Sequence, residues 1–228
     1  MKIGFIGAGE MTGVLGRRLV LLGHEVLIGS RSPDKARKIA AAIGAGRAGS
    51  YDDAAAFGEI VFVALHNNAV LPALAGVAPG LLAGKILVDC NNPVDPPDFE
   101  NRYGSAGSLA EDIARAVPTA RVVKAFNTIY AELIESDMPL PGGAPINLFI
   151  AGDDPAAKSA IDAIGRQLGY AVVDAGGLRK ARHLENLAAF EIDIVFGRGF
   201  APYVALTLSA GRAVGQVVDD AATTPETG

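Results

Sequence analysis

The stretch IGFIGAG, residues 3–9, decides the fold of this chain. An apolar run ends in two glycines, and a helical pattern over residues 11–22 follows at once. Glycine permits a tight turn from strand to helix and lets the backbone approach a phosphate closely, while the first helical amides face that anion. The order of strand, glycine turn and helix therefore predicts a dinucleotide site at the end of the first strand.

The turn supplies the first set of candidate cofactor contacts. These are Gly7, Ala8, Gly9, Glu10, Met11 and Thr12. Thr12 stands where the third glycine of the G-x-G-x-x-G pattern falls, and Gly13 comes one residue later, in a variant often associated with NADP. We interpret Gly13 as a packing residue rather than as a cofactor contact.

The rest of the chain alternates short apolar runs with amphipathic stretches, which is typical of a mainly parallel sheet covered by helices. The predicted strands are 3–6, 26–28, 60–65, 85–89, 121–125, 148–151 and 171–173, and the predicted helices are 11–22, 34–43, 70–77, 108–116, 156–168, 181–196 and 202–217. We expect an α/β, Rossmann-type doubly wound domain over 1–177. A short C-terminal helical appendage over 178–218 and a flexible tail over 219–228 complete the prediction.

Length, charge and cysteine content exclude several classes of protein. A chain of 228 residues has room for one doubly wound domain and a small appendage, but not for a large second substrate domain. A net charge of −5 gives no basic surface for nucleic acid. The single cysteine, Cys90, is expected to be a small buried residue, and three histidines without cysteine neighbours predict no metal site. No membrane-length apolar run or targeting segment is visible, so we expect a cytoplasmic protein without a membrane partner.

The end of the second strand indicates which dinucleotide is bound. An NAD-specific site usually places a carboxylate there, about 20 residues beyond the glycine turn, to bind the ribose 2′-hydroxyl. This chain has Ser30 and Arg31 instead, which suit a 2′-phosphate, and Lys35 follows one helical turn later. The pattern favours NADP, although Arg31 and Lys35 could also be ordinary solvated charges.

Polar residues at the ends of later strands are further candidates. Leu65, His66 and Asn67 follow the fourth strand, where a Rossmann chain passes the nicotinamide ribose, although His66 could instead be a capping or buried hydrogen-bonded histidine. Asn91 could orient the nicotinamide carboxamide or merely cap a turn. Asn127 has an amide able to donate and accept in the plane of a flat ring, so we assign it an orienting role in catalysis.

Several segments together resemble the F420-dependent NADP oxidoreductase family. They are IGSR at 28–31, VVKAFNTI at 122–129, AGDD at 151–154 and DAGGL at 174–178. The segments VKAFNT at 123–128 and DCNNP at 89–93 are also similar to the NADPH-binding reductase domain of six-transmembrane metalloreductases. The resemblance places Ala125 and Asn127 beside the cofactor. It implies direct hydride transfer between NADPH and coenzyme F420, with little acid or base chemistry from the protein. The family usually has a histidine where this chain has Asn127.

These observations predict an NADPH-dependent reductase whose acceptor is a flat redox cofactor, with F420 as the named candidate. The alternatives are a flavin or ferric reductase and a non-catalytic NADP-binding sensor. Hydroxyacid dehydrogenases are disfavoured because they need a larger helical domain than the segment after residue 177 provides. A set of apolar residues near the C-terminus predicts a homodimer: Phe190, Ile194, Phe196, Phe200 and Leu206.

Overall fold

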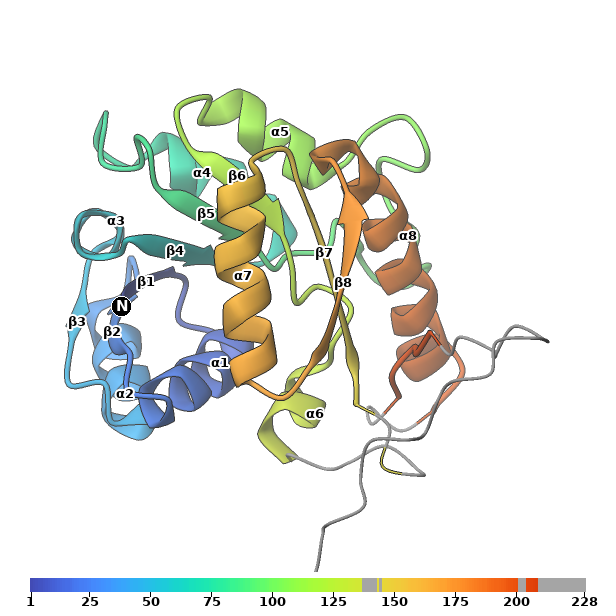
Figure 1. Ribbon diagram of the computed structural model, residues 1–228, viewed down its shortest axis with the longest axis horizontal. Helices are drawn as coiled ribbons and strands as arrows, with labels where there is room; N and C mark the ends of the chain where they lie inside the picture. The colour runs from blue at the N-terminus through green and yellow to red at the C-terminus, as the bar shows by residue number, and fades with distance from the viewer. Residues whose placement is uncertain (137–142, 144, 201–203, 209–228) are drawn as a thin grey trace, which may run out of the picture.

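The computed structural model describes residues 1–136, 143, 145–200 and 204–208, and its centre is one eight-stranded sheet flanked by helices (Figure 1). The strands are β1 (Lys2–Ile6), β2 (Glu25–Gly29), β3 (Ala48–Gly49), β4 (Ile60–Val63), β5 (Ile86–Asp89), β6 (Arg121–Lys124), β7 (Asn147–Gly152) and β8 (Ala171–Gly176). Their order is β3-β2-β1-β4-β5-β6-β7-β8, and every pair is parallel except β6 with β7. The expected Rossmann-type, mainly parallel sheet is confirmed.

Helices cover both faces of the sheet because the central strands are apolar on both sides. In β4, Ile60 and Phe62 face one core, and Val61 and Val63 face the other. The first core is closed by α1 (Glu10–Leu21), α2 (Pro33–Ile43), α6 (Ala131–Ser136) and α7 (Pro155–Gln167). The second is closed by α3 (Tyr51–Phe57), α4 (Asn67–Ala75) and α5 (Leu109–Ala116). The last helix, α8 (Ala181–Ile192), packs on β7 through Leu184 and Phe149.

Some elements differ from the sequence-based expectation. The short elements α3, α6 and β3 were not predicted, because each is too brief to show a hydrophobic period. The helix α3 forms through a capping box between Ser50 and Asp53. The predicted helix over 202–217 is wrong for residues 204–208, which are not helical. The rest of that prediction, 202–203 and 209–217, lies outside the described residues, as does the predicted tail over 219–228. The domain boundary at 177 stays a prediction.

The connections place a switch point between β1 and β4. From β1 the chain moves outward through β2 to β3, then crosses back to β4 and continues to the other edge. The loops after β1 and β4 therefore diverge, leaving a crevice at the carboxyl ends of the strands, which is where open α/β sheets bind ligands. In the described part of the chain, no helix is both long and apolar enough to cross a membrane.

Candidate functional site

The glycine turn has the backbone geometry that the sequence predicts. Gly7 has a φ of +133°, and a Cβ atom there would lie 2.1 Å from the carbonyl oxygen of Ala64, at the end of β4. Gly9 precedes the first turn of α1, and a Cβ atom there would meet no protein atom within 4 Å. Gly7 is therefore required by the fold, whereas Gly9 leaves open space in front of the helix amides.

A cavity of about 620 Å³ lies at this switch point. The predicted residues that line it are Ala8, Gly9, Glu10, Met11, Ser30, Arg31, Lys35, Leu65, His66 and Asn91. They come from the ends of β1, β2, β4 and β5 and from the first turns of α1 and α2. One edge of the sheet thus brings together most of the residues that the sequence analysis selected from separate strands.

Other predicted contacts do not reach this cavity. The Thr12 side chain is fully buried in α1, and Ala125 is fully buried after β6. The Asn67 amide donates hydrogen bonds to the carbonyl of Val94 and the carboxylate of Asp95, so it holds the 94–95 loop. Gly7 does not line the cavity; its role is to allow the tight turn between β1 and α1. Thr12, Asn67 and Ala125 are therefore buried residues that do not line this cavity.

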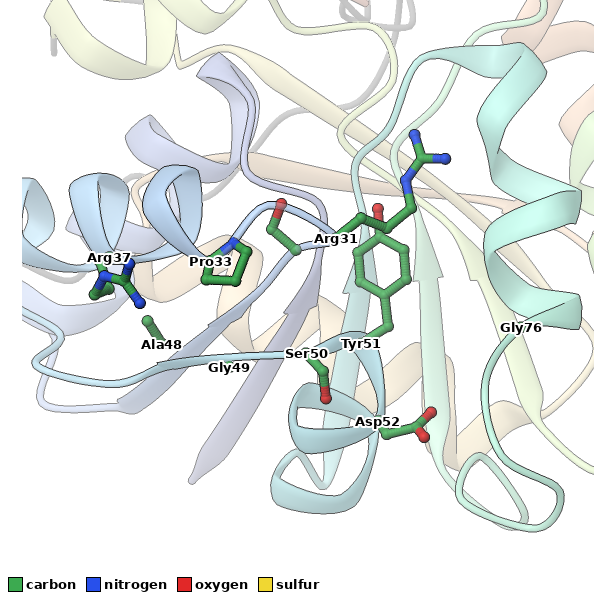
Figure 2. Close-up of a pocket in the computed structure, with 10 residues that line it drawn as sticks. Arg31, Pro33, Arg37, Ala48, Gly49, Ser50, Tyr51, Asp52 and Gly76 are labelled. Carbon is green, nitrogen blue, oxygen red and sulfur yellow. The ribbon is translucent and has the colours of Figure 1, made fainter.

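At the end of β2, a second pocket of about 500 Å³ continues from the first cavity, and both share Ser30, Arg31 and Tyr51. Figure 2 shows the Arg31 side chain reaching up beside the Tyr51 ring, whereas Arg37 lies on the other side of Pro33. Arg37 is paired with Asp34. Neither Arg31 nor Lys35 has a hydrogen bond or ion pair with any residue that the structure describes, so both cations are available to an anionic ligand.

Tyr51 is a site residue that the sequence analysis missed. It begins α3 and lines both pockets at the end of β2. Its flat ring beside Arg31 offers an apolar surface on which a planar base could stack. The sequence signal that could have identified Tyr51 is Ser50, because a capping serine marks the start of a helix, here at the carboxyl edge of the sheet.

The loop after β4 is held by Asn91. Its Oδ1 accepts a hydrogen bond of 2.7 Å from the Leu65 amide, and its Nδ2 donates to the Val63 carbonyl and the Asp89 carboxylate. All of its side-chain hydrogen-bonding groups are thus used within the protein. Asn91 positions the 65–66 backbone, and the exposed His66 precedes α4 without capping it through its side chain.

Beneath Asn91 lies a buried charge network that the sequence analysis also missed. Lys124 is fully buried and lies 2.9 Å from Asp89 and 3.0 Å from Glu185. Glu185 in turn accepts hydrogen bonds from the amides of Leu109 and Ala110, at the start of α5. Burial acts to lower the pKa of Lys124, but the two carboxylates outweigh it and raise that pKa. The network ties β5, β6, α5 and α8 together beneath the crevice.

A third cavity, of about 510 Å³, continues the crevice toward α8. It shares Glu10, Met11, Cys90 and Asn92 with the cavity at the glycine turn. Its walls are mostly apolar, with Phe99, Ile129 and Phe196 among them. Cys90 is buried and its thiol pKa is raised by that burial, so the expectation of a small buried residue is confirmed.

Asn127 lies on the wall of this third cavity. Its Nδ2 already donates to Asn92 Oδ1 at 2.9 Å and to the Leu184 carbonyl at 3.0 Å. Its Oδ1 is buried and has no hydrogen-bond partner in the described part of the chain. An amide that both donates to and accepts from a ring is therefore not available here: Asn127 can offer a ligand only its oxygen.

The sheet order, the glycine turn and the crevice define a Rossmann-type dinucleotide-binding protein. The family model for NADP oxidoreductase, coenzyme F420-dependent, matches residues 2–93. The F420-dependent NADP reductase of Methanothermobacter marburgensis is 30% identical, and the alignment covers 85% of this chain and 92% of that protein. The chain belongs to the F420-dependent NADP oxidoreductase family.

Two further proteins are similar over most of this chain. A crystal structure of a protein from Arthrobacter sp. FB24, assigned as an F420-dependent NADP-reductase, matches with a TM-score of 0.78 and 33% identity, covering 89% of this chain and 96% of that one. Metalloreductase STEAP3 of Rattus norvegicus is 32% identical over 82% of this chain. This chain spans only 36% of the length of that metalloreductase.

Proposed function

We propose that this protein is an NADPH-dependent reductase that transfers hydride between NADPH and a flat redox cofactor, with coenzyme F420 as the first candidate. One observation carries the proposal: the three cavities form a continuous row from Arg31, past the glycine turn, to Asn127. NADP in the first two would present its nicotinamide at the residues shared with the third. A second ring in the third cavity could then receive hydride directly.

Family membership supports F420 as the acceptor, because relatives that match over most of their length carry that cofactor in their names. The similarity to metalloreductases supports one alternative, an NADPH-dependent flavin or ferric reductase. The test is to mix protein and NADPH with F420, FMN, FAD or a ferric chelate and to follow acceptor and NADPH absorbance. Reduction of F420 at the highest rate is expected. Reduction of flavins or ferric chelates alone would favour the alternative, and tight NADPH binding with no acceptor reduced would indicate a sensor.

Arg31 is proposed to bind the 2′-phosphate of NADPH. Its replacement by alanine is expected to weaken NADPH binding by roughly 1.5–3 kcal/mol, the value of a lost charged hydrogen bond, with little effect on NADH. Isothermal titration with both dinucleotides measures the difference. The matched control is Lys38→Ala, which removes an exposed cation of α2 outside the cavities. Equal losses for NADPH and NADH would contradict the assignment.

We also propose that the protein is a homodimer. Phe190, Phe196 and Phe200 are 56%, 61% and 60% exposed, and a second copy of the chain would remove these apolar side chains from water. Light scattering coupled to size exclusion is expected to give twice the chain mass at micromolar concentration, and Phe190→Glu is expected to give the single-chain mass. A monomer for the unmodified protein would rule the dimer out.

Two finer parts of the prediction also remain proposals. A reducing cytoplasm suits a protein whose one cysteine is free and buried and whose proposed donor is NADPH. The segment after residue 177 is proposed to work as an appendage that closes the third cavity, since α8 contributes Ala188 and Glu191 to its wall.

A further inference from the structure

The third cavity has an unusual polar wall. Four of its lining residues each contain a buried side-chain oxygen without a hydrogen-bond partner in the described part of the chain: Asn127, Thr128, Tyr130 and Glu191. A buried polar group without a partner is destabilising, so several at one place are more consistent with a ligand surface than with a core. Most of the remaining wall is apolar and suits a flat ring, and its other polar members are Glu10, Asn92 and Glu132.

Glu191 is the most unusual member of this wall. It lies on α8 and is 3% exposed, and its Oε1 has no partner among the described residues. Its carboxylate accepts one hydrogen bond, from the backbone amide of Leu206. No lysine, arginine or histidine lines the cavity in the described residues, and the other ionisable groups on its wall are Glu10, Cys90, Tyr130 and Glu132.

These surroundings favour the neutral, proton-carrying form of Glu191. Burial raises its pKa to about 7, only partly offset by the Leu206 amide. The Tyr130 hydroxyl keeps its proton as well, because burial and then the neighbouring Glu191 and Glu132 raise its pKa. Near neutral pH the wall can therefore offer a carboxylic acid proton to a ligand whose other atoms lie close to the nicotinamide.

We propose that Glu191 is the proton donor to the acceptor bound in this cavity, and that the acceptor is an organic ring that takes hydride at a carbon and a proton at a nitrogen. The proposal rests on the proposed function, because the hydride comes from NADPH. It adds a catalytic acid to a site that the family resemblance describes as needing little acid or base chemistry.

The step balances in atoms and charge. The C4–H bond of the dihydronicotinamide breaks, and its hydrogen and electron pair form a C–H bond on the acceptor, so that NADPH is oxidised to NADP⁺. The O–H bond of the Glu191 carboxyl breaks, and its proton forms an N–H bond on the reduced ring. Glu191 is left as a carboxylate and recovers its proton from solvent before the next turnover. A ferric ion accepts an electron without a proton and would leave this acid unused.

The test is Glu191→Gln, which keeps the shape of the side chain but cannot donate a proton. Wild-type single-turnover reduction of F420 by NADPH is expected to be level below pH 7 and to fall tenfold per pH unit above it. The variant is expected to be at least about 100-fold slower at pH 6, to lose this pH dependence, and to bind NADPH within threefold of wild type. Glu135→Gln, an exposed position on α6 outside the cavity, is the matched control and is expected to keep the wild-type profile.

A second measurement needs no turnover. A carboxyl whose pKa is raised in the folded state contributes stability that is present below its unfolded pKa and is lost as pH rises through the folded pKa, about 7. At pH 4.5 the glutamine variant should therefore unfold at the same temperature as wild type. At pH 8.5 it should unfold at a higher temperature than wild type. If the variant and wild type unfold at the same temperature at pH 4.5 and again at pH 8.5, the proposal is overturned, because Glu191 would then be an ordinary carboxylate.

The outcomes separate the two proposals. If wild type reduces no acceptor, the proposed function fails and the proton donor with it. If wild type and the glutamine variant reduce F420 at the same rate with the same pH profile, the proton donor alone is overturned. A slow, pH-independent variant that still binds NADPH supports both.

Discussion

Replacing Lys124 by methionine is expected to lower the free energy of unfolding by about 3–5 kcal/mol at pH 8. Methionine roughly preserves the volume, so a cavity would contribute little. The cost arises because Asp89 and Glu185, which lie 2.9 and 3.0 Å from the ammonium, would remain buried without a cation. Urea unfolding followed by circular dichroism measures the change.

The pH dependence of the stability of Lys124→Met shows whether unpaired charge causes its loss of stability. Burial already raises the pKa of Glu185, and loss of the ammonium is expected to raise it further, so protonation at pH 5 removes much of the cost of burying this carboxylate. The loss should therefore be smaller at pH 5 than at pH 8. The control is Arg166→Met, which breaks an exposed pair with Asp162 and should cost under about 1 kcal/mol at either pH. A loss for Lys124→Met that does not depend on pH would point to packing instead of charge.

Replacing Gly7 by alanine is expected to remove both stability and NADPH binding. The new Cβ atom would lie 2.1 Å from the Ala64 carbonyl oxygen, and a φ of +133° is strained for any residue with a side chain. The loops after β1 and β4 must then separate, at a cost of about 3 kcal/mol or more. Thermal unfolding and NADPH titration give the two quantities.

Gly9→Ala is the matched control for the turn. Its φ of −101° is ordinary, and its Cβ atom would meet no protein atom within 4 Å. We therefore expect wild-type stability but NADPH binding weakened at least tenfold, because the methyl group would take space in front of the helix amides. If this variant bound NADPH normally, the turn would not be the pyrophosphate site.

Much of the NADP half of the site could be predicted from residue order. Gly9, Ser30, Arg31 and His66 all line one cavity because each follows a parallel strand, and such strands end at the same edge of the sheet. The third cavity could not be predicted in the same way. Ala188 and Glu191 reach it from α8, and nothing local in that helix indicates which strand it packs on.

The direction of individual side chains was the other feature of the site that the sequence could not predict. Thr12 and Asn67 stand next to Met11 and His66, which line the cavity, yet both are buried and do not line it. One position along a helix turns a side chain by about 100°, so a correct segment still leaves individual contacts undecided. The same holds for Asn127, whose amide hydrogens are taken by Asn92 and Leu184.

The sequence by itself determined the order of strand, glycine turn and helix, the expectation of NADP and the expected position of its site at the carboxyl edge of the sheet, because these depend on local backbone geometry and on alternation along the chain. Only the tertiary structure decided that Lys124 lies between two buried carboxylates and that Glu191 is buried in the wall of the third cavity. Burial and charge pairing are set by residues far apart in the chain, and they acquire their energies only when α8 packs against the sheet.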